Sequence, residues 1–107
     1  MSTAENRYAL EFLPQFEEDM REAVDYISLT LRNPDAADKL VDDTFAAIYM
    51  RQNAPESFAP YPSKLDREHP YYRIPVGNFI VLYVVIGNVM EVRRFIYARR
   101  NWHSWLM

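Results

Sequence analysis

Cysteine is absent from this sequence of 107 residues, and glycine occurs only twice. The absence of cysteine excludes disulfide bonds, cysteine-ligated zinc and thiol catalysis. With so little glycine, and with no repeats or low-complexity runs, the chain does not resemble a disordered protein. Half of the residues are hydrophobic and 15% are aromatic, which is enough to fill one core. This length and composition predict a single domain over residues 1–107.

The sequence also lacks a hydrophobic run long enough to cross a bilayer as a helix. Its longest near-apolar run, residues 74–86, is interrupted by Pro75, Gly77 and Asn78. The N-terminal segment has neither the basic start nor the apolar stretch of a signal peptide. We therefore expect a cytoplasmic protein with no membrane partner.

Acidic residues are scarce in the last third of the chain. Residues 1–70 carry seven Lys/Arg and fourteen Asp/Glu, whereas residues 71–107 carry five arginines and one glutamate. Such an asymmetry indicates an anionic partner for the C-terminal part. The alternative is that some of these arginines pair with acids on the predicted helices. The five arginines are Arg73, Arg93, Arg94, Arg99 and Arg100.

Hydrophobic periodicity predicts a strand and two helices in the first half. A short apolar run over Tyr8–Phe12 is typical of a strand, and residues 14–32 have the spacing of an amphipathic helix. A second helix should begin after Asn33 as N-cap, with Pro34 at its first position, and should fade near residue 53. Two helices joined this closely form an αα-hairpin.

The adjacent acids on these helices have an ordinary interpretation. Glu17, Glu18 and Asp19 follow one another on the first helix, and Asp42 and Asp43 lie on the second. We expect them on solvated helix faces, not in a metal or glycosidase site. No cofactor or metal is predicted.

The clearest pattern is a three-strand meander near the end of the chain. Strands are predicted over 71–76, 79–86 and 89–98, separated by the turn pairs Gly77-Asn78 and Gly87-Asn88. The middle strand is apolar at both its odd and its even positions, so it should lie in the centre of the sheet and be covered on both faces. Residues 54–70, rich in proline, should form an ordered wrap or a functional loop.

The third strand of the meander carries arginine on both faces, which indicates an edge strand or the wall of a cleft. Strict alternation places two sets of side chains on opposite faces. One set is Met90, Val92, Arg94, Ile96 and Ala98, and the other is Glu91, Arg93, Phe95 and Tyr97. The predicted fold is therefore α+β, in the order β-α-α-β-β-β. It has an αα-hairpin packed on a mainly antiparallel four-stranded sheet.

This order of elements, ending in paired arginines, resembles the RelE/ParE toxin superfamily over nearly the whole chain. The likeness is sharpest in Tyr72-Arg73-Ile74, in the hairpin VGNFIVLY of residues 76–83, and in VRRFIYARRNW of residues 92–102. The resemblance implies a bacterial type II toxin that a smaller antitoxin holds inactive. DNA would then be contacted only through the antitoxin. Within the superfamily, the RelE and YoeB branch cleaves mRNA at the ribosome, whereas the ParE branch poisons DNA gyrase.

The resemblance leaves open whether a ribonuclease site is present. In the RelE and YoeB branch an arginine follows the aromatic residue that opens the middle strand, and here Ile80 takes that place. Arg100, with Arg99 beside it, matches another family arginine. The catalytic C-terminal tyrosine has no clear match, since Trp105 falls near its place. This difference favours the gyrase-poisoning mode.

Other residues of the chain could nevertheless replace the arginine and the tyrosine that the ribonuclease branch uses. Cleavage by 2′-hydroxyl attack needs a base, an acid and positive charge on the phosphate. Arginine forks onto phosphate oxygens, and histidine titrates in the range useful for proton transfer. Tyr72 and Tyr97 are either proton donors or packing residues. The candidate catalytic residues are Arg73, Arg94, Arg100 and His103, and the candidate target-binding residues are Arg73, Arg93, Arg94, Arg99, Arg100 and Trp102.

Two other classes of function remain open. Arginines interleaved with aromatic residues also suit a non-toxic module that binds single-stranded RNA. A structural dimer module on the same fold is the second alternative, because a fold does not determine its function.

Overall fold

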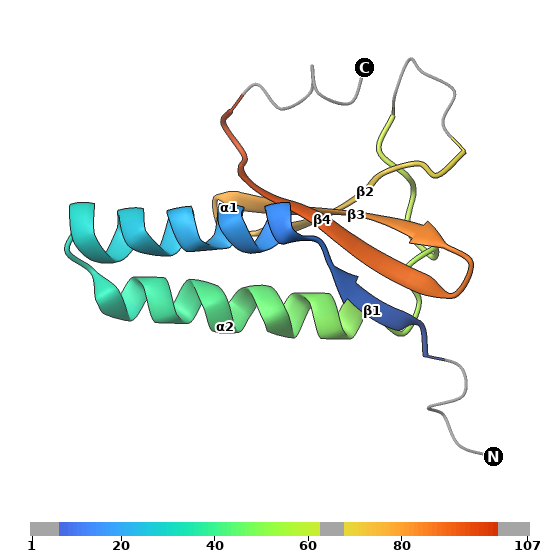
Figure 1. Ribbon diagram of the computed structural model, residues 1–107, viewed down its shortest axis with the longest axis horizontal. Coiled ribbons are helices and arrows are strands. Elements are labelled where there is room, and N and C mark those ends of the chain that lie inside the picture. Colours follow the sequence, from blue (N-terminus) through green and yellow to red (C-terminus); the bar gives the residue numbers. More distant parts are fainter. Residues whose placement is uncertain (1–6, 63–67, 101–107) are drawn as a thin grey trace.

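The computed structural model describes residues 7–62 and 68–100, and it confirms the α+β fold. Figure 1 shows the two long helices lying side by side against the sheet. The αα-hairpin on a four-stranded sheet is thus as predicted. In chain order the elements are β1 (Ala9–Phe12), α1 (Pro14–Asp25), a π-helix η2 (Tyr26–Thr30), α2 (Pro34–Arg51), β2 (Tyr72–Val76), β3 (Phe79–Ile86) and β4 (Val89–Tyr97).

The sheet has the strand order β1-β4-β3-β2, and β1 pairs with β4 in parallel while the other neighbours are antiparallel. The predicted central position of β3 is confirmed. The suggestion that the last strand lies at an edge is wrong, because β1 adds to its outer side with Ala9 opposite Val89. In the described part of the chain, no helix is long and apolar enough to cross a membrane.

A β-bulge in β4 changes which residues face the helices. Leu82 pairs with Arg94 and Tyr83 pairs with Val92, so Arg93 is an extra residue in the ladder. The strict alternation expected for this strand is therefore wrong beyond Arg93, because one inserted residue moves all later side chains to the opposite face. Met90, Val92 and Phe95 share the main core, and Ile96 lies on the other side of the sheet.

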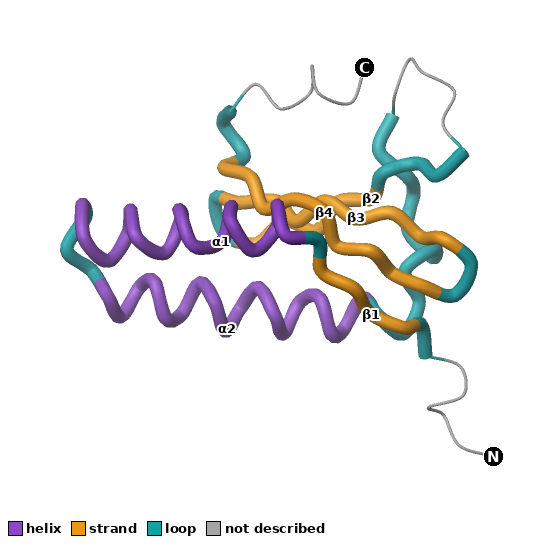
Figure 2. Tube along the Cα trace, viewed as in Figure 1, coloured by secondary structure: helices purple, strands orange, loops and turns teal. Residues whose placement is uncertain are grey.

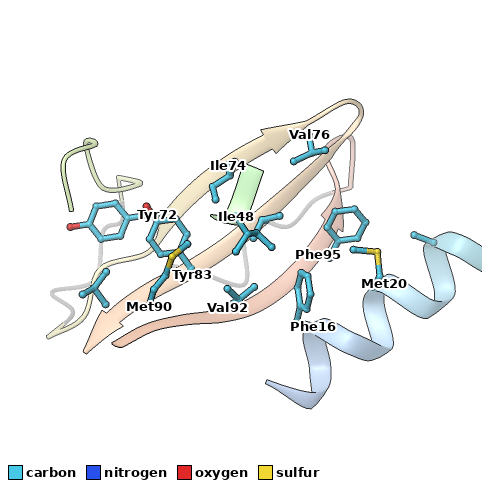
Figure 3. Packing of buried hydrophobic residues seen from close by; sticks show 13 residues of the cluster. Phe16, Met20, Ile48, Tyr72, Ile74, Val76, Tyr83, Met90, Val92 and Phe95 are labelled. Atoms are coloured by element: carbon cyan, nitrogen blue, oxygen red, sulfur yellow. The ribbon is translucent and has the colours of Figure 1, made fainter. Parts of the chain in front are cut away.

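The main core lies between the helices and the sheet. Figure 3 shows Phe16 and Met20 of α1 close to Phe95 of β4, and the Phe16 and Phe95 ring centroids are 6.0 Å apart. Ile48 from α2 and Tyr83 from β3 are fully buried in the same cluster. This packing holds α1 over β4.

A smaller cluster covers the opposite face of the sheet. Ile80, Leu82 and Ile96 are buried there, with Tyr61 and Tyr71 packed against them. Figure 2 shows the described part of the segment between α2 and β2 as loop. The backbone of this loop closes on the sheet through the bond from Tyr61 N to Tyr71 O, 2.6 Å. The expected ordered wrap is therefore confirmed for its described residues.

The connection between the helices follows the predicted caps with one difference. The Asn33 side chain accepts a hydrogen bond from Ala36 N at 3.1 Å, and Pro34 opens α2. However, the first helix does not continue as a regular α-helix to residue 32, because its last turn is the π-helix η2. Arg32 follows with a φ of 54°, a left-handed conformation that is strained for a side chain with a Cβ.

Candidate functional site

Two of the candidate arginines lie on the sheet face that points away from the helices. We call this surface the arginine face and define it by Arg73, Arg93, Tyr61, Tyr71 and Glu91. Arg73 is exposed on β2, where buried and exposed residues alternate. Its guanidinium carbon lies 5.1 Å from the centroid of the Tyr61 ring. This stacking leaves the cationic group at the surface on an aromatic support.

Arg93 lies on this face together with Glu91, two residues before it in β4. Its Nε donates to Glu91 Oε1 at 2.9 Å and its Nη1 donates to the Tyr71 hydroxyl at 3.3 Å. Burial acts to lower the pKa of Arg93, but the hydrogen bonds to Tyr71 and Glu91 outweigh it, and the pKa is raised. The guanidinium therefore remains charged.

Between these two arginines the sheet surface is apolar. Ile80 pairs across the ladders with Pro75 and Ile96 and is buried against Leu82 and Ile96. The position that holds an arginine in the ribonuclease branch is thus part of a hydrophobic cluster in this protein. The face can bind an anion at its flanks, through arginines on β2 and β4, but not at its centre.

Arg94 points the other way and is held by a helix acid. The Asp19 carboxylate of α1 accepts from Arg94 Nε at 2.7 Å and from Arg94 Nη2 at 3.2 Å. It also accepts from Phe95 N at 3.0 Å and from Gln15 Nε2 at 2.9 Å. Asp19 is only 8% exposed, so its expected place on a solvated helix face is wrong. Arg94 therefore pairs with an acid of a helix, which was the alternative to contact with an anionic partner.

The remaining candidates do not join the arginine face in the described structure. Arg99 and Arg100 are exposed after the end of β4, and Arg100 lines a separate cleft. Trp102 and His103 lie outside the described residues. Tyr72 is a buried core residue stacked on Tyr83, whereas Tyr97 is 40% exposed.

Arg51, which no sequence pattern indicates as a functional residue, links α2, the loop and the sheet. Its Nη1 donates to the Tyr83 hydroxyl at 2.9 Å and to Arg73 O at 3.3 Å. Its guanidinium carbon lies 3.6 Å from the centroid of the Phe58 ring. The buried Tyr83 hydroxyl in turn donates to Pro55 O at 2.7 Å. This network holds the loop beside β2 and supports the strand that presents Arg73.

A cleft beside the end of the first helix was also missed. It has a volume of about 630 Å³, within the range of ligand pockets. We call it the helix-tip cleft. Its lining is mainly apolar, and the sequence gives no signal for it because its walls come from distant segments. The lining residues are Asp19, Glu22, Ala23, Tyr26, Ile27 and Leu31 on one side and Asn78, Phe79, Phe95, Tyr97 and Arg100 on the other.

Among residues 7–62 and 68–100, no group of three or more His, Asp or Glu side chains could hold a metal ion.

Comparison with known proteins gives one family and one fold. No curated protein matches the chain. A solved structure described as the chromosomal ParDE TA system from P. aeruginosa is similar, with a TM-score of 0.68 and 18% sequence identity. The match covers 88% of this chain and 99% of that chain, and at this identity it shows the fold alone.

The family model that matches is described as the ParE toxin of the type II toxin-antitoxin system, parDE, and it covers residues 10–102. The matched segment begins within β1 and extends past the end of β4. Because the match spans nearly the whole chain, this protein belongs to the ParE toxin family of type II toxin–antitoxin systems.

Proposed function

We propose that this protein arrests bacterial growth by poisoning DNA gyrase and does not cleave mRNA. The observation that carries this proposal is the burial of Ile80 in the cluster with Leu82 and Ile96. A buried apolar side chain cannot stabilise the negative charge that develops on a phosphate during cleavage. Loss of one such charge-stabilising donor typically lowers a rate by about 10²–10³.

The arginine face would then serve as a contact surface for the target. Arg73 and Arg93 flank the apolar centre, and Arg99, Arg100 and Trp102 follow in the chain. Arginines supported by aromatic rings are common anchors of macromolecular interfaces. Arg94 would act indirectly, since its guanidinium is committed to Asp19.

The proposal is tested by two assays on one preparation of purified protein, gyrase supercoiling and ribosome-dependent mRNA cleavage. We expect inhibition of supercoiling, and we expect Arg73→Ala and Arg93→Ala to weaken it. Arg21→Ala is the matched control, because Arg21 is an exposed arginine on α1 whose partner is Glu18. The choice of target would be reversed by codon-specific mRNA cuts that vanish in Arg100→Ala or His103→Ala while gyrase is unaffected.

The antitoxin is proposed to cover the arginine face with an acidic segment. Arg73 is exposed, and Arg93 is charged and part-buried. Such groups favour a carboxylate-bearing partner, and removing one member of a buried charge pair costs about 2–5 kcal/mol. The triple variant with alanine at Arg73, Arg93 and Arg100 should therefore bind the antitoxin more weakly and with less dependence on salt. An equally tight and equally salt-dependent complex would contradict this arrangement.

Cleavage of mRNA remains the second candidate, with Arg73 and Arg100 on the phosphate and His103 as acid or base. It is favoured by the exposed position of Arg73 at the flank of the apolar centre. Cuts by this route should be slow, because Ile80 leaves the centre uncharged.

A further inference from the structure

The helix-tip cleft presents apolar side chains that the described part of the chain leaves open to solvent. Tyr26 is 55% exposed and Leu31 is 54% exposed, and Tyr97 on the opposite wall is 40% exposed. Figure 1 shows the paired helices extending beyond the end of the sheet, so their tip has no strand beneath it. Exposed apolar side chains grouped at the rim of a cleft mark an interaction surface.

The sheet side of the cleft is a rigid aromatic wall. The Phe79 and Phe95 rings are stacked with centroids 4.7 Å apart, and Tyr97 meets Phe79 edge-on at 5.6 Å. Both strands that carry these rings are interior strands of the sheet. Aromatic rings pack favourably on one another in stacked or edge-on arrangements, and a preformed wall lowers the entropic cost of binding. The cleft is therefore suited to a large aromatic side chain.

The chain itself arrives at this cleft where β4 ends. Tyr97 and Arg100 both line the cleft, and Arg100 N donates to Tyr97 O at 3.0 Å in the turn that follows the strand. An extended chain spans at most about 3.3–3.6 Å per residue, so residue 105 can lie up to roughly 17 Å from Arg100. Residues 101–107 can consequently reach across the cleft without any change in the sheet.

The composition of residues 101–107 is complementary to the cleft. This segment holds both tryptophans of the protein and no charged Lys, Arg, Asp or Glu side chain. Trp105 is followed by two more apolar residues, Leu106 and Met107, whereas Trp102 stands between polar neighbours. Since polar groups lose free energy when they enter apolar surroundings without hydrogen bonds, Trp105 fits the cleft better than Trp102.

We propose that the helix-tip cleft is an intramolecular binding site for residues 101–107, with the Trp105 ring inserted between Tyr26 and Tyr97. The docked segment fastens the tip of the helix hairpin to the end of β4 and covers the apolar side chains that face solvent there. It also holds Arg100 close to the sheet. This inference goes beyond the proposed function, because it concerns the isolated chain and involves neither the antitoxin nor the target.

Tryptophan fluorescence of the purified full chain tests the proposal directly, because both tryptophans lie in the segment. Trp102→Phe leaves Trp105 as the single reporter. The acrylamide quenching constant of Trp105 should then be below about half of its value in the urea-unfolded chain, because a docked ring leaves at most half of its surface to solvent. Its emission should also lie at shorter wavelengths than in urea, since the ring is in apolar surroundings.

Variants of the helix wall identify the place where the ring docks. Tyr26→Ser and Leu31→Ser, each added to the Trp102→Phe chain, should raise the quenching constant of Trp105 toward the unfolded value. Both side chains are more than half exposed, so the fold should be retained, which far-ultraviolet circular dichroism checks. Leu29→Ser is the matched control and should change nothing, because Leu29 lies in the same π-turn and is 72% exposed but does not line the cleft.

Three outcomes would overturn the proposal. Trp105 might be quenched as strongly in the native chain as in urea, which would leave the cleft to a separate partner. Shielding of Trp105 that persists in both Tyr26→Ser and Leu31→Ser would mean that the ring packs elsewhere. Shielding that is lost on dilution would place the segment in the cleft of a second copy. None of these results would affect the proposed function, which is tested on gyrase and on mRNA.

Discussion

Replacement of Asp19 by alanine removes the polar link between α1 and the bulged strand β4. The carboxylate accepts three hydrogen bonds from β4, two from the Arg94 guanidinium and one from Phe95 N. Without it, Arg94 loses its ion pair with Asp19 and the buried Phe95 N–H loses its acceptor. The substitution therefore removes an ion pair and leaves one buried donor unsatisfied at the wall of the core.

The expected loss of stability is large for one side chain. Removing one member of a buried ion pair costs about 3–5 kcal/mol. Arg94 is 29% exposed, so water can reach part of its guanidinium and the cost lies toward the lower end. An unsatisfied buried N–H adds about 1–3 kcal/mol when no water replaces the acceptor. We expect Asp19→Ala to lower the free energy of unfolding by about 4 kcal/mol.

Urea denaturation at equilibrium measures this effect, with Glu17→Ala as the control for an exposed acid on the same helix. The control should stay within about 0.5 kcal/mol of the wild type. Since Asp19 and Arg94 act as a pair, the double alanine variant should lose less than the sum of the two single losses. A loss below about 1 kcal/mol for Asp19→Ala, or strict additivity with Arg94→Ala, would refute the reasoning.

Three further predictions concern caps, strain and ionisation. Asn33→Ala removes the N-cap of α2 and should lower the free energy of unfolding by about 1 kcal/mol, measured in urea. Arg32→Gly relieves a left-handed backbone conformation and should raise the melting temperature, with a gain of about 0.5–1 kcal/mol; no change would show that φ = 54° carries no strain. Burial raises the pKa of Tyr83 above its ordinary value of 10.0, against the opposing effect of Arg51. Because the folded state holds this proton more tightly than the unfolded chain, that contribution to stability is complete below pH 10 and is lost as the pH rises through the raised pKa. Tyr83→Phe should therefore lessen the alkaline loss of stability in urea titrations, and an unchanged pH profile would contradict this.

The elements of the fold were predictable because each has a local signal. Helical spacing, the Asn33-Pro34 start of α2 and the Gly-Asn turns are all properties of neighbouring residues. The central place of β3 also followed from its composition alone. The bulge did not, because Arg93 and Arg94 are equally compatible with regular alternation, and only the register against β3 reveals the extra residue.

The sequence predicted which types of residue form the candidate site, but not how these residues are arranged in space. The arginine cluster was found by charge, but the binding of Arg94 to a helix acid depends on Asp19, which lies far away in the sequence. Asp19 itself looks like its exposed neighbours Glu17 and Glu18 in sequence. The helix-tip cleft joins segments that are far apart in the chain, so no local pattern could indicate it.

The parallel pairing of β1 with β4 has a consequence for synthesis of the protein. Ala9 finds its partner Val89 about 80 residues later, and β4 lies in the interior of the sheet between β1 and β3. A nascent chain that has not yet released β4 therefore lacks the strand that joins β1 to β3 and against which α1 packs. Contacts of such long range also slow folding. The Arg93 side of the arginine face and the wall of the cleft that holds Phe95 and Tyr97 consequently form only after β4 has left the ribosome, late in translation.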